Sequence, residues 1–178
     1  MPSDIIVALD IPVYKIWFVC NYKAHQPNTV LLDNALATTG AGVPAAIVAQ
    51  LVHLDRKILE ICGDDGFTIN SQELKTAVQL SLQLATLILR DKAYGTIQWK
   101  QANMGSPNFG VEYDNSDFVK YAKRSGAHGH RLTSADQLLD ILKTCPDSLG
   151  VHGIEAPVDY SENDRILNHD IQELSQEV

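Results

Sequence analysis

Short apolar runs alternate with amphipathic stretches along this 178-residue chain, and this alternation restricts the possible folds more than any other feature. The apolar runs predict strands at residues 5–9, 29–32, 57–62, 84–89, 128–132 and 151–156. The stretches between them predict helices at 13–22, from the Gly40–Pro44 segment to about 53, and at 71–82, 116–125 and 134–143. Strand–helix alternation implies βαβ crossovers. We therefore expect an α/β fold, a three-layer, doubly wound, mostly parallel sheet with helices on both faces.

Length and composition favour one domain over residues 1–178. Hydrophobic residues make up 45% of the chain, which is enough for a core. The polar residues at 161–178 are expected to form a helical surface segment at the end of the sequence. Residues 103–115 have glycines, a proline and little periodicity, so they predict a long loop, and long loops in compact domains are often functional.

The net charge is −8, which argues against nucleic acid and anionic membranes as partners. No apolar stretch is long enough to span a bilayer, and no secretory signal is visible. The three cysteines do not have the spacing of metal ligands, so we expect reduced thiols in a cytoplasmic protein. Cys20 and Cys62 stand in apolar runs, which predicts that both are buried.

Acidic residues follow two of the predicted strands. Asp64 lies in Gly63-Asp64-Asp65-Gly66 after the strand at 57–62, and Asp91 directly follows the strand region at 84–89. Doubly wound sheets bind ligands at the carboxyl ends of their strands, so the two carboxylates can converge there. Carboxylate and carbonyl oxygens suit Mg²⁺, which would neutralise a bound diphosphate. Taken alone, each aspartate has an explanation that needs no metal, because an aspartate after a strand is commonly a helix cap or part of a solvated turn.

The histidines offer a competing metal hypothesis. His128 and His130 share one face of a predicted strand and could bind an ion, but no third ligand is near in sequence, so a half-buried strand explains them better. His25, His53, His152 and His169 are expected at the surface or in loops. The chain has neither a nucleophile elbow nor a Walker lysine loop.

The acidic pair and its surroundings resemble a known family. Asp64 and Asp91 are 27 residues apart, similar to the motif of thiamine diphosphate enzymes that begins Gly-Asp-Gly and ends in an Asn/Asp-rich turn. The flanking sequence resembles the diphosphate-binding domain of acetolactate synthase large subunits. The matching stretches are QPNT at 26–29, DNALAT at 33–38, GAGVP at 40–44, NSQEL at 70–74, WKQANMG at 99–105 and PVDYSEN at 157–163.

The resemblance implies a role for each candidate residue. Asp64 and Asp91 would bind Mg²⁺ through their side chains, and Ala93 would bind it through its backbone carbonyl. The remaining residues would contact thiamine diphosphate, mostly through backbone groups near its phosphates: Val13, Tyr14, Thr39, Gly63, Asp65, Gly66, Tyr94, Gly95 and Thr96.

The sequence departs from the family pattern at three of these positions and at Lys92 beside them. Asp65 replaces the last residue of Gly-Asp-Gly and brings a carboxylate towards the diphosphate. Thr39 replaces the large apolar residue that bends the cofactor, and Thr96 stands where close relatives have methionine. Lys92 replaces a usual Asn or Asp. The metal ligands are retained, whereas the surroundings of the cofactor are altered.

Three functions follow from these observations. In the first, the chain is part of an enzyme whose substrate is a 2-keto acid. That enzyme condenses two molecules of pyruvate into 2-acetolactate with loss of CO₂. Such a site also needs a pyrimidine-binding domain with an activating glutamate, which here must come from another chain, and a homo-oligomer is expected. In the second, the chain is a degenerate, inactive module for binding or assembly. In the third, an unrelated doubly wound domain uses magnesium and phosphate.

Overall fold

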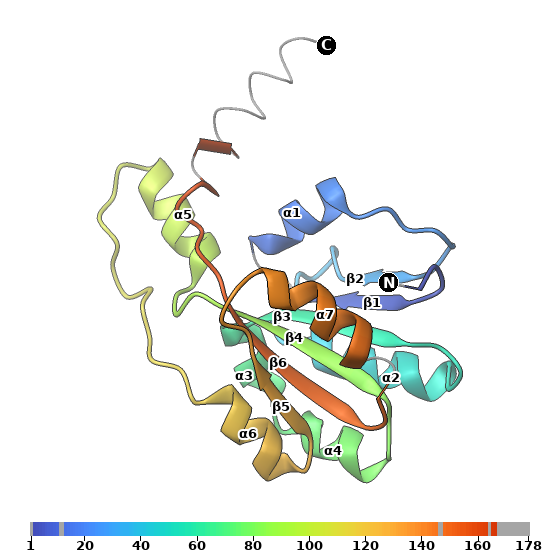
Figure 1. Cartoon of the computed structure of the whole chain (residues 1–178). Coiled ribbons are helices and arrows are strands. Elements are labelled where there is room, and N and C mark those ends of the chain that lie inside the picture. The colour runs from blue at the N-terminus through green and yellow to red at the C-terminus, as the bar shows by residue number, and fades with distance from the viewer. Residues whose placement is uncertain (1, 11–12, 146–147, 164, 167–178) are drawn as a thin grey trace.

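The computed structural model describes residues 2–10, 13–145, 148–163 and 165–166. They form one six-stranded sheet in the order β2-β1-β3-β4-β6-β5, and every strand pair in it is parallel (Figure 1). The strands are β1 (Ile6–Leu9), β2 (Val30–Leu32), β3 (Ile58–Gly63), β4 (Leu84–Arg90), β5 (His128–Arg131) and β6 (Val151–Pro157). The predicted α/β class with a parallel sheet is confirmed.

Helices connect the strands and cover the sheet. They are α1 (Tyr14–Asn21), α2 (Gly42–Val52), α3 (Asp64–Asn70), α4 (Glu73–Gln79), α5 (Gly95–Asn103), α6 (Phe118–Ser125) and α7 (Asp136–Thr144). Helices α2, α3, α4 and α6 lie on one face, and α1 and α7 lie on the other (Figure 1). Each face has its own core, with Phe67 and Ile88 fully buried in the first and Val7 and Ile154 in the second. The sheet is therefore the middle of three layers, as the alternation predicted.

Two helices were not predicted from the sequence. Helix α3 follows β3 without a loop, although its Asp-Asp-Gly start has low helix propensity. Packing outweighs that propensity, because Phe67 is buried and its ring meets the Phe118 ring edge-on at 5.4 Å between centroids. As a result Ser71 is the C-cap of α3, and the helix predicted at 71–82 is wrong at both ends, since α4 covers only Glu73–Gln79. Helix α5 has no buried residue and hence no apolar periodicity to reveal it.

The predicted long loop is present between α5 and α6. Among the described residues, the loop forms one isolated β-bridge, in which Glu112 pairs with Ala93 in antiparallel fashion. The loop ends at Asp117, whose carboxylate caps α6 by accepting a hydrogen bond from the Lys120 N–H at 3.0 Å. Most of the expected surface segment at 161–178 lies outside the described residues, so that segment and the extent of the domain stay predictions.

Two expectations about burial are wrong. Cys20 is exposed, because it lies near the end of α1 on the side away from the sheet core, whereas Cys62 is buried as predicted. His152 was expected at the surface but is buried in β6, with 3% of its area exposed. A histidine between Val151 and Gly153 has no sequence signal of its own, and its burial depends on α7 covering that end of the sheet.

Candidate functional site

The carboxyl ends of β1, β3 and β4 border a cavity of about 350 Å³. It lies at the topological switch point of the sheet, where β2 lies on one side of β1 and β3 lies on the other. Doubly wound sheets bind ligands at this position. The cavity is lined by Val13, Tyr14, Thr39, Gly63, Asp65, Asp91, Ala93, Tyr94, Gly95 and Thr96 from the sequence candidates, and also by Ile69, Leu89, Ile97 and Tyr160.

Asp64 lies beside this cavity but not on its wall. Its side chain is fully buried, and both carboxylate oxygens already accept hydrogen bonds. Oδ1 accepts from the Asp65 N–H at 3.0 Å and from the Tyr113 hydroxyl at 2.6 Å. Oδ2 accepts from the Lys92 N–H at 2.9 Å and from the Asn115 amide. A carboxylate offers about four acceptor positions, so these four donors occupy all of them.

Tyr113 and Asn115 are functional candidates that sequence reasoning missed. Both belong to the long loop between α5 and α6, which was expected to matter but was given no residue-level role. The loop reaches the motif turn through backbone hydrogen bonds, from the Tyr94 N–H to the Val111 carbonyl and from the Tyr113 N–H to the Lys92 carbonyl. Burial and the hydrogen bond to Asp64 raise the pKa of Tyr113, so its hydroxyl remains a neutral donor.

Asp91 faces the cavity at the end of β4. Burial and the neighbouring carboxylates of Asp64 and Asp65 raise the pKa of Asp91 to about 6. The Ala93 N–H donates to its Oδ1 at 3.3 Å. A Cβ at Gly95 would stand 2.8 Å from Asp91 Oδ2, so only glycine lets α5 begin this close to the carboxylate. Clustered carboxylates that repel one another are a setting in which a cation stabilises the charged form.

Asp65 occupies the turn at the start of α3 with its own carboxylate. Its Oδ1 accepts a hydrogen bond from the Gly66 N–H at 2.7 Å. Burial raises the pKa of Asp65, and the charge of Asp64 acts in the same direction. The resemblance assigns three N–H groups here to the diphosphate, and all three already have protein acceptors. The Asp65 N–H donates to Asp64, the Gly66 N–H to Asp65 and the Tyr94 N–H to Val111.

A second layer of acidic side chains lies beneath the cavity. Asp10 is buried and accepts from the Gly40 N–H through both oxygens, at 3.0 and 2.8 Å. Gly66 packs directly on it, because a Cβ there would lie 2.0 Å from Asp10 Oδ2. Glu60 is fully buried in β3, and burial raises its pKa to about 8. These contacts leave no room for side chains on the glycines that shape the floor of the site.

The rest of the wall is apolar and aromatic. Tyr14 is anchored by its hydroxyl, which donates to the Ile61 carbonyl at 2.9 Å. Tyr160 was not proposed as a site residue, although it lies in one of the stretches that carry the family resemblance; burial and the nearby aspartates raise its pKa. The cavity thus combines an acidic end, which suits a cation, with an apolar and aromatic end, which suits an organic ring system.

Lys92 adopts a backbone conformation that is unusual for a lysine. Its φ is +62°, in the left-handed region where Asn and Asp are several-fold enriched. Its N–H donates to Asp64 and its carbonyl accepts from Tyr113, so the turn that imposes this φ also connects the two loops. The lysine therefore occupies a conformation that suits the usual residue better.

The fold and the cavity define a doubly wound domain with a candidate ligand site at its strand ends, and comparison with known proteins identifies its family. Residues 10–156 match the family described as "Thiamine pyrophosphate enzyme, C-terminal TPP binding domain". The chain belongs to this family of thiamine pyrophosphate (TPP, or thiamine diphosphate) enzymes. It is, more particularly, a TPP-binding domain of the acetolactate synthase-like enzymes.

The relatives support this assignment over most of the chain. Acetolactate synthase of Bacillus subtilis is 35% identical over 90% of this chain and 28% of its own length. Catabolic acetolactate synthase of Raoultella terrigena is 32% identical over 93% of this chain and 30% of its own length. Pyruvate oxidase of Lactiplantibacillus plantarum is 29% identical over 79% and 23%. The chain thus spans less than a third of the length of these relatives. Among the described residues, no helix is long and apolar enough to cross a membrane.

Proposed function

We propose that the chain holds thiamine diphosphate together with Mg²⁺ at the cavity, as the diphosphate-binding half of an acetolactate-forming enzyme. The observation that carries the proposal is the position of two aspartates at the ends of neighbouring strands, Asp64 after β3 and Asp91 after β4, beside one cavity. When bound, the cofactor supplies a carbanion that adds to the carbonyl of a 2-keto acid. The protein contributes binding, orientation and charge.

The donor set suits a hard cation. Asp91 and Asp64 would bind Mg²⁺ through carboxylate oxygens, and Ala93 would bind it through its carbonyl. Burial and then the charges of Asp64 and Asp65 raise the pKa of Asp91 to about 6, and the cation would offset both effects by stabilising the charged carboxylate. Gly63, Gly66 and Gly95 keep the phosphate end of the cavity free of side chains, while Val13, Thr39 and Thr96 face its interior. The residues present therefore fit the group, on one condition.

The condition concerns Asp64. All four of its acceptor positions are occupied, so one donor must leave before Asp64 can bind a metal directly. The Asp65 and Lys92 N–H groups belong to the motif turns themselves. Tyr113 and Asn115 belong to the loop between α5 and α6, which can move without disturbing the sheet. We infer that cofactor binding displaces one or both of these side chains.

A complete site of this kind needs a second domain. We propose that a pyrimidine-binding domain of another chain supplies the activating carboxylate. Helix α2 supports an assembly, because it exposes Val48, Leu51 and Val52 to 58%, 48% and 68% of their areas. We expect the chain to form homo-oligomers through such surfaces. The assembled enzyme would condense two pyruvates into 2-acetolactate.

The alternative is a degenerate module that takes part in binding or assembly without catalysis. A specific observation favours it: the Asp65 carboxylate already accepts from the Gly66 N–H, where a phosphate oxygen would otherwise bind. Thr39 adds a hydroxyl where the family has an apolar side chain.

We also propose a cytoplasmic location, since Cys20, Cys62 and Cys145 are all free thiols.

Calorimetric titration of the chain with thiamine diphosphate and Mg²⁺ tests the binding proposal. We expect a saturable heat that requires both ligands and is lost in Asp91→Asn. Asp55→Asn is the matched control and should bind normally, because Asp55 is exposed and precedes β3, at the opposite end of that strand from the cavity. The absence of saturable heat in the native chain would overturn the proposal. A pyruvate-to-acetolactate assay of the chain alone should show no turnover, and activity should appear only when a pyrimidine-domain chain is added.

A further inference from the structure

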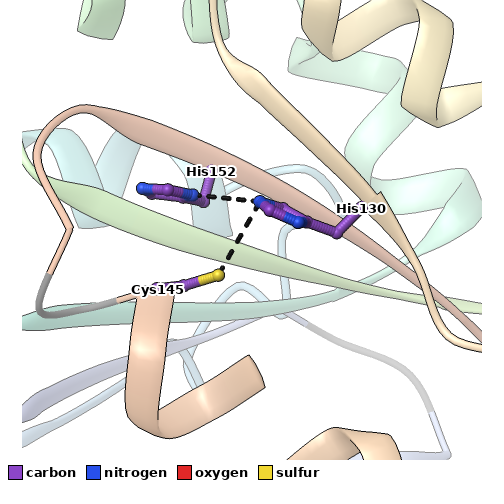
Figure 2. A group of neighbouring side chains, drawn as sticks. All are labelled: His130, Cys145 and His152. Carbon is purple, nitrogen blue, oxygen red and sulfur yellow. Dashed lines mark hydrogen bonds between the residues drawn. The ribbon is translucent and has the colours of Figure 1, made fainter. Parts of the chain in front are cut away.

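Three side chains that sequence reasoning did not connect meet on the α7 face of the sheet (Figure 2). His130 comes from β5, His152 from β6 and Cys145 from the end of α7. His130 Nε2 lies 3.1 Å from His152 Nδ1, and Cys145 Sγ lies 3.8 Å from His130 Nε2. One ligand atom from each residue lies within 4.8 Å of the other two. Among the described residues, this is the one group of three His, Cys, Asp or Glu side chains that close together.

The cluster is separate from the cofactor cavity. His152 is the second residue of β6, and Pro157 at the other end of β6 pairs with Arg90, which precedes Asp91. Five residues of strand span about 16 Å, so the two sites lie at opposite ends of the sheet. The chemistry differs as well, since one end presents carboxylates and the other presents nitrogen and sulfur.

We propose that His130, Cys145 and His152 bind a zinc ion. In a tetrahedral zinc site, bonds of about 2.0 Å to nitrogen and 2.3 Å to sulfur place two nitrogens about 3.3 Å apart and a nitrogen and a sulfur about 3.5 Å apart. The observed 3.1 and 3.8 Å are close to these values. The group as a whole spans up to 4.8 Å, so the Cys145–His152 pair must close by up to about 1.3 Å to place all three ligands around one ion. Three protein ligands leave a fourth position for a solvent molecule.

The surroundings favour zinc over hard cations. Thiolate and imidazole prefer zinc to magnesium. Burial lowers the pKa of both His130 and His152, which keeps their rings neutral and able to coordinate. Ser148 Oγ lies 3.1 Å from His152 Nε2, so a proton on that nitrogen leaves the Nδ1 lone pair free to face the cluster. A histidine that binds a metal through one ring nitrogen usually donates a hydrogen bond to a protein partner from the other ring nitrogen.

The site would connect α7 to the sheet. Helix α7 has no fully buried residue, and its packing relies on partly buried side chains such as Leu138, Ile141 and Leu142. An ion shared between Cys145 at its end and two strands adds a cross-link that the unfolded chain lacks. Binding that is specific for the folded state raises stability in proportion to the logarithm of free zinc.

The competing explanation is a metal-free cluster in which the two imidazoles share a hydrogen bond and the thiol packs beside them. His128 extends this cluster, since its ring stacks on His152 with 4.8 Å between centroids. A cobalt titration of the chelator-treated, reduced chain distinguishes the two. Cobalt bound to a thiolate gives a charge-transfer band in the near ultraviolet, which a hydrogen-bonded cluster or histidines alone do not produce.

We expect one equivalent of Co²⁺ to produce this band and one equivalent of Zn²⁺ to remove it, with excess Mg²⁺ having no effect. Cys145→Ser should abolish the band, and His130→Ala or His152→Ala should weaken cobalt binding by about tenfold or more. Cys20→Ser and His53→Ala are matched controls, because both residues lie away from the cluster, and they should bind like the native chain.

A thermal unfolding series gives a second readout that does not depend on cobalt spectra. Zinc should raise the Tm of the native chain and of Cys20→Ser, and it should leave the Tm of Cys145→Ser unchanged. The absence of a saturable band in the native chain, or a band that persists in Cys145→Ser, would overturn the proposal. A folded Cys145→Ser variant that zinc still stabilises to the native extent would overturn it equally.

Discussion

The Tyr113 hydroxyl donates a hydrogen bond of 2.6 Å to Asp64 Oδ1, across 49 residues of sequence. This bond joins a loop without regular structure to the acidic residue at the end of the central strand β3. It means that the proposed metal ligand is held by the protein until something replaces its donors. Several consequences of this arrangement can be measured.

Tyr113→Phe should strengthen binding of Mg²⁺ with thiamine diphosphate. Removing the hydroxyl frees one acceptor position on Asp64 without changing the shape of the ring. A hydrogen bond to a charged group contributes about 1.5 kcal/mol or more, which corresponds to about a tenfold change in Kd. Calorimetry of the native chain and the variant measures the change, with Tyr22→Phe, which does not line the cavity, as the control. Weaker binding in Tyr113→Phe would show instead that the hydroxyl orients Asp64 for the metal.

Asp65→Gly should also strengthen binding of the cofactor. The change removes a carboxylate that accepts from the Gly66 N–H, and like charges about 4 Å apart cost about 1 to 4 kcal/mol depending on the dielectric. We expect Kd to fall about tenfold or more. Asp65→Asn keeps the shape and the hydrogen-bonding oxygen but removes the charge, so it should give part of the gain. Equal affinity in all three proteins would mean that Asp65 turns away from the ligand.

Lys92→Asn should stabilise the folded chain by about 0.5 to 1 kcal/mol. Asparagine tolerates the left-handed conformation that residue 92 adopts at φ +62°, and the hydrogen bonds there involve only the backbone. Urea unfolding of the two proteins measures the difference. Lys92→Ala serves as the control, because it removes the same side chain without favouring that conformation. A gain of the same size in Lys92→Ala would contradict the backbone explanation.

Glu60→Gln should change how stability depends on pH. Burial raises the pKa of Glu60 from 4.5 to about 8, so the folded state binds its proton more tightly than the unfolded state. The contribution of neutral Glu60 is complete below pH 4.5 and is lost as pH rises to about 8. The variant should match the native chain near pH 5 and be more stable by about 4 kcal/mol at pH 9. Denaturant unfolding at both values measures this.

Exposed Glu112→Gln is the control for the pH series, and it should leave the difference between the two pH values as in the native chain. The amide in Glu60→Gln also offers a donor where Glu60 Oε1 and Thr86 Oγ1 both lack partners among the described residues. Parallel pH curves for the native chain and Glu60→Gln would show that Glu60 is charged in the folded state at all these values.

Gly66→Ala should destabilise the chain by about 2 kcal/mol, because its Cβ would lie 2.0 Å from Asp10 Oδ2. Thermal or urea unfolding measures the loss. Asp10→Ser removes the clashing oxygens while keeping a small polar side chain. A double-mutant cycle with both changes should therefore show a loss smaller than the sum of the single losses. Strict additivity would mean that the backbone at residue 66 moves away and avoids the contact.

Much of the fold could be predicted because its signals are local. Five of the six strands are short apolar runs, β5 with its His-Gly-His-Arg sequence being the exception, and the six predicted strands match β1 to β6 within a residue or two. The neighbouring positions of β3 and β4, and hence the closeness of Asp64 to Asp91, follow from the short connection between parallel strands. Helix α5 escaped prediction because none of its residues is buried, and α3 escaped because Phe67 overrides a poor helix sequence.

The sequence by itself determined the α/β class, the ends of the strands and the residues that carry the family pattern, since these depend on local composition and spacing. Only the tertiary structure decided that Tyr113 and Asn115 saturate Asp64, because loop contacts across some 50 residues leave no local signal. The same holds for the cluster of His130, Cys145 and His152. Strand register and the packing of α7 bring these side chains together, and no spacing in the sequence encodes either.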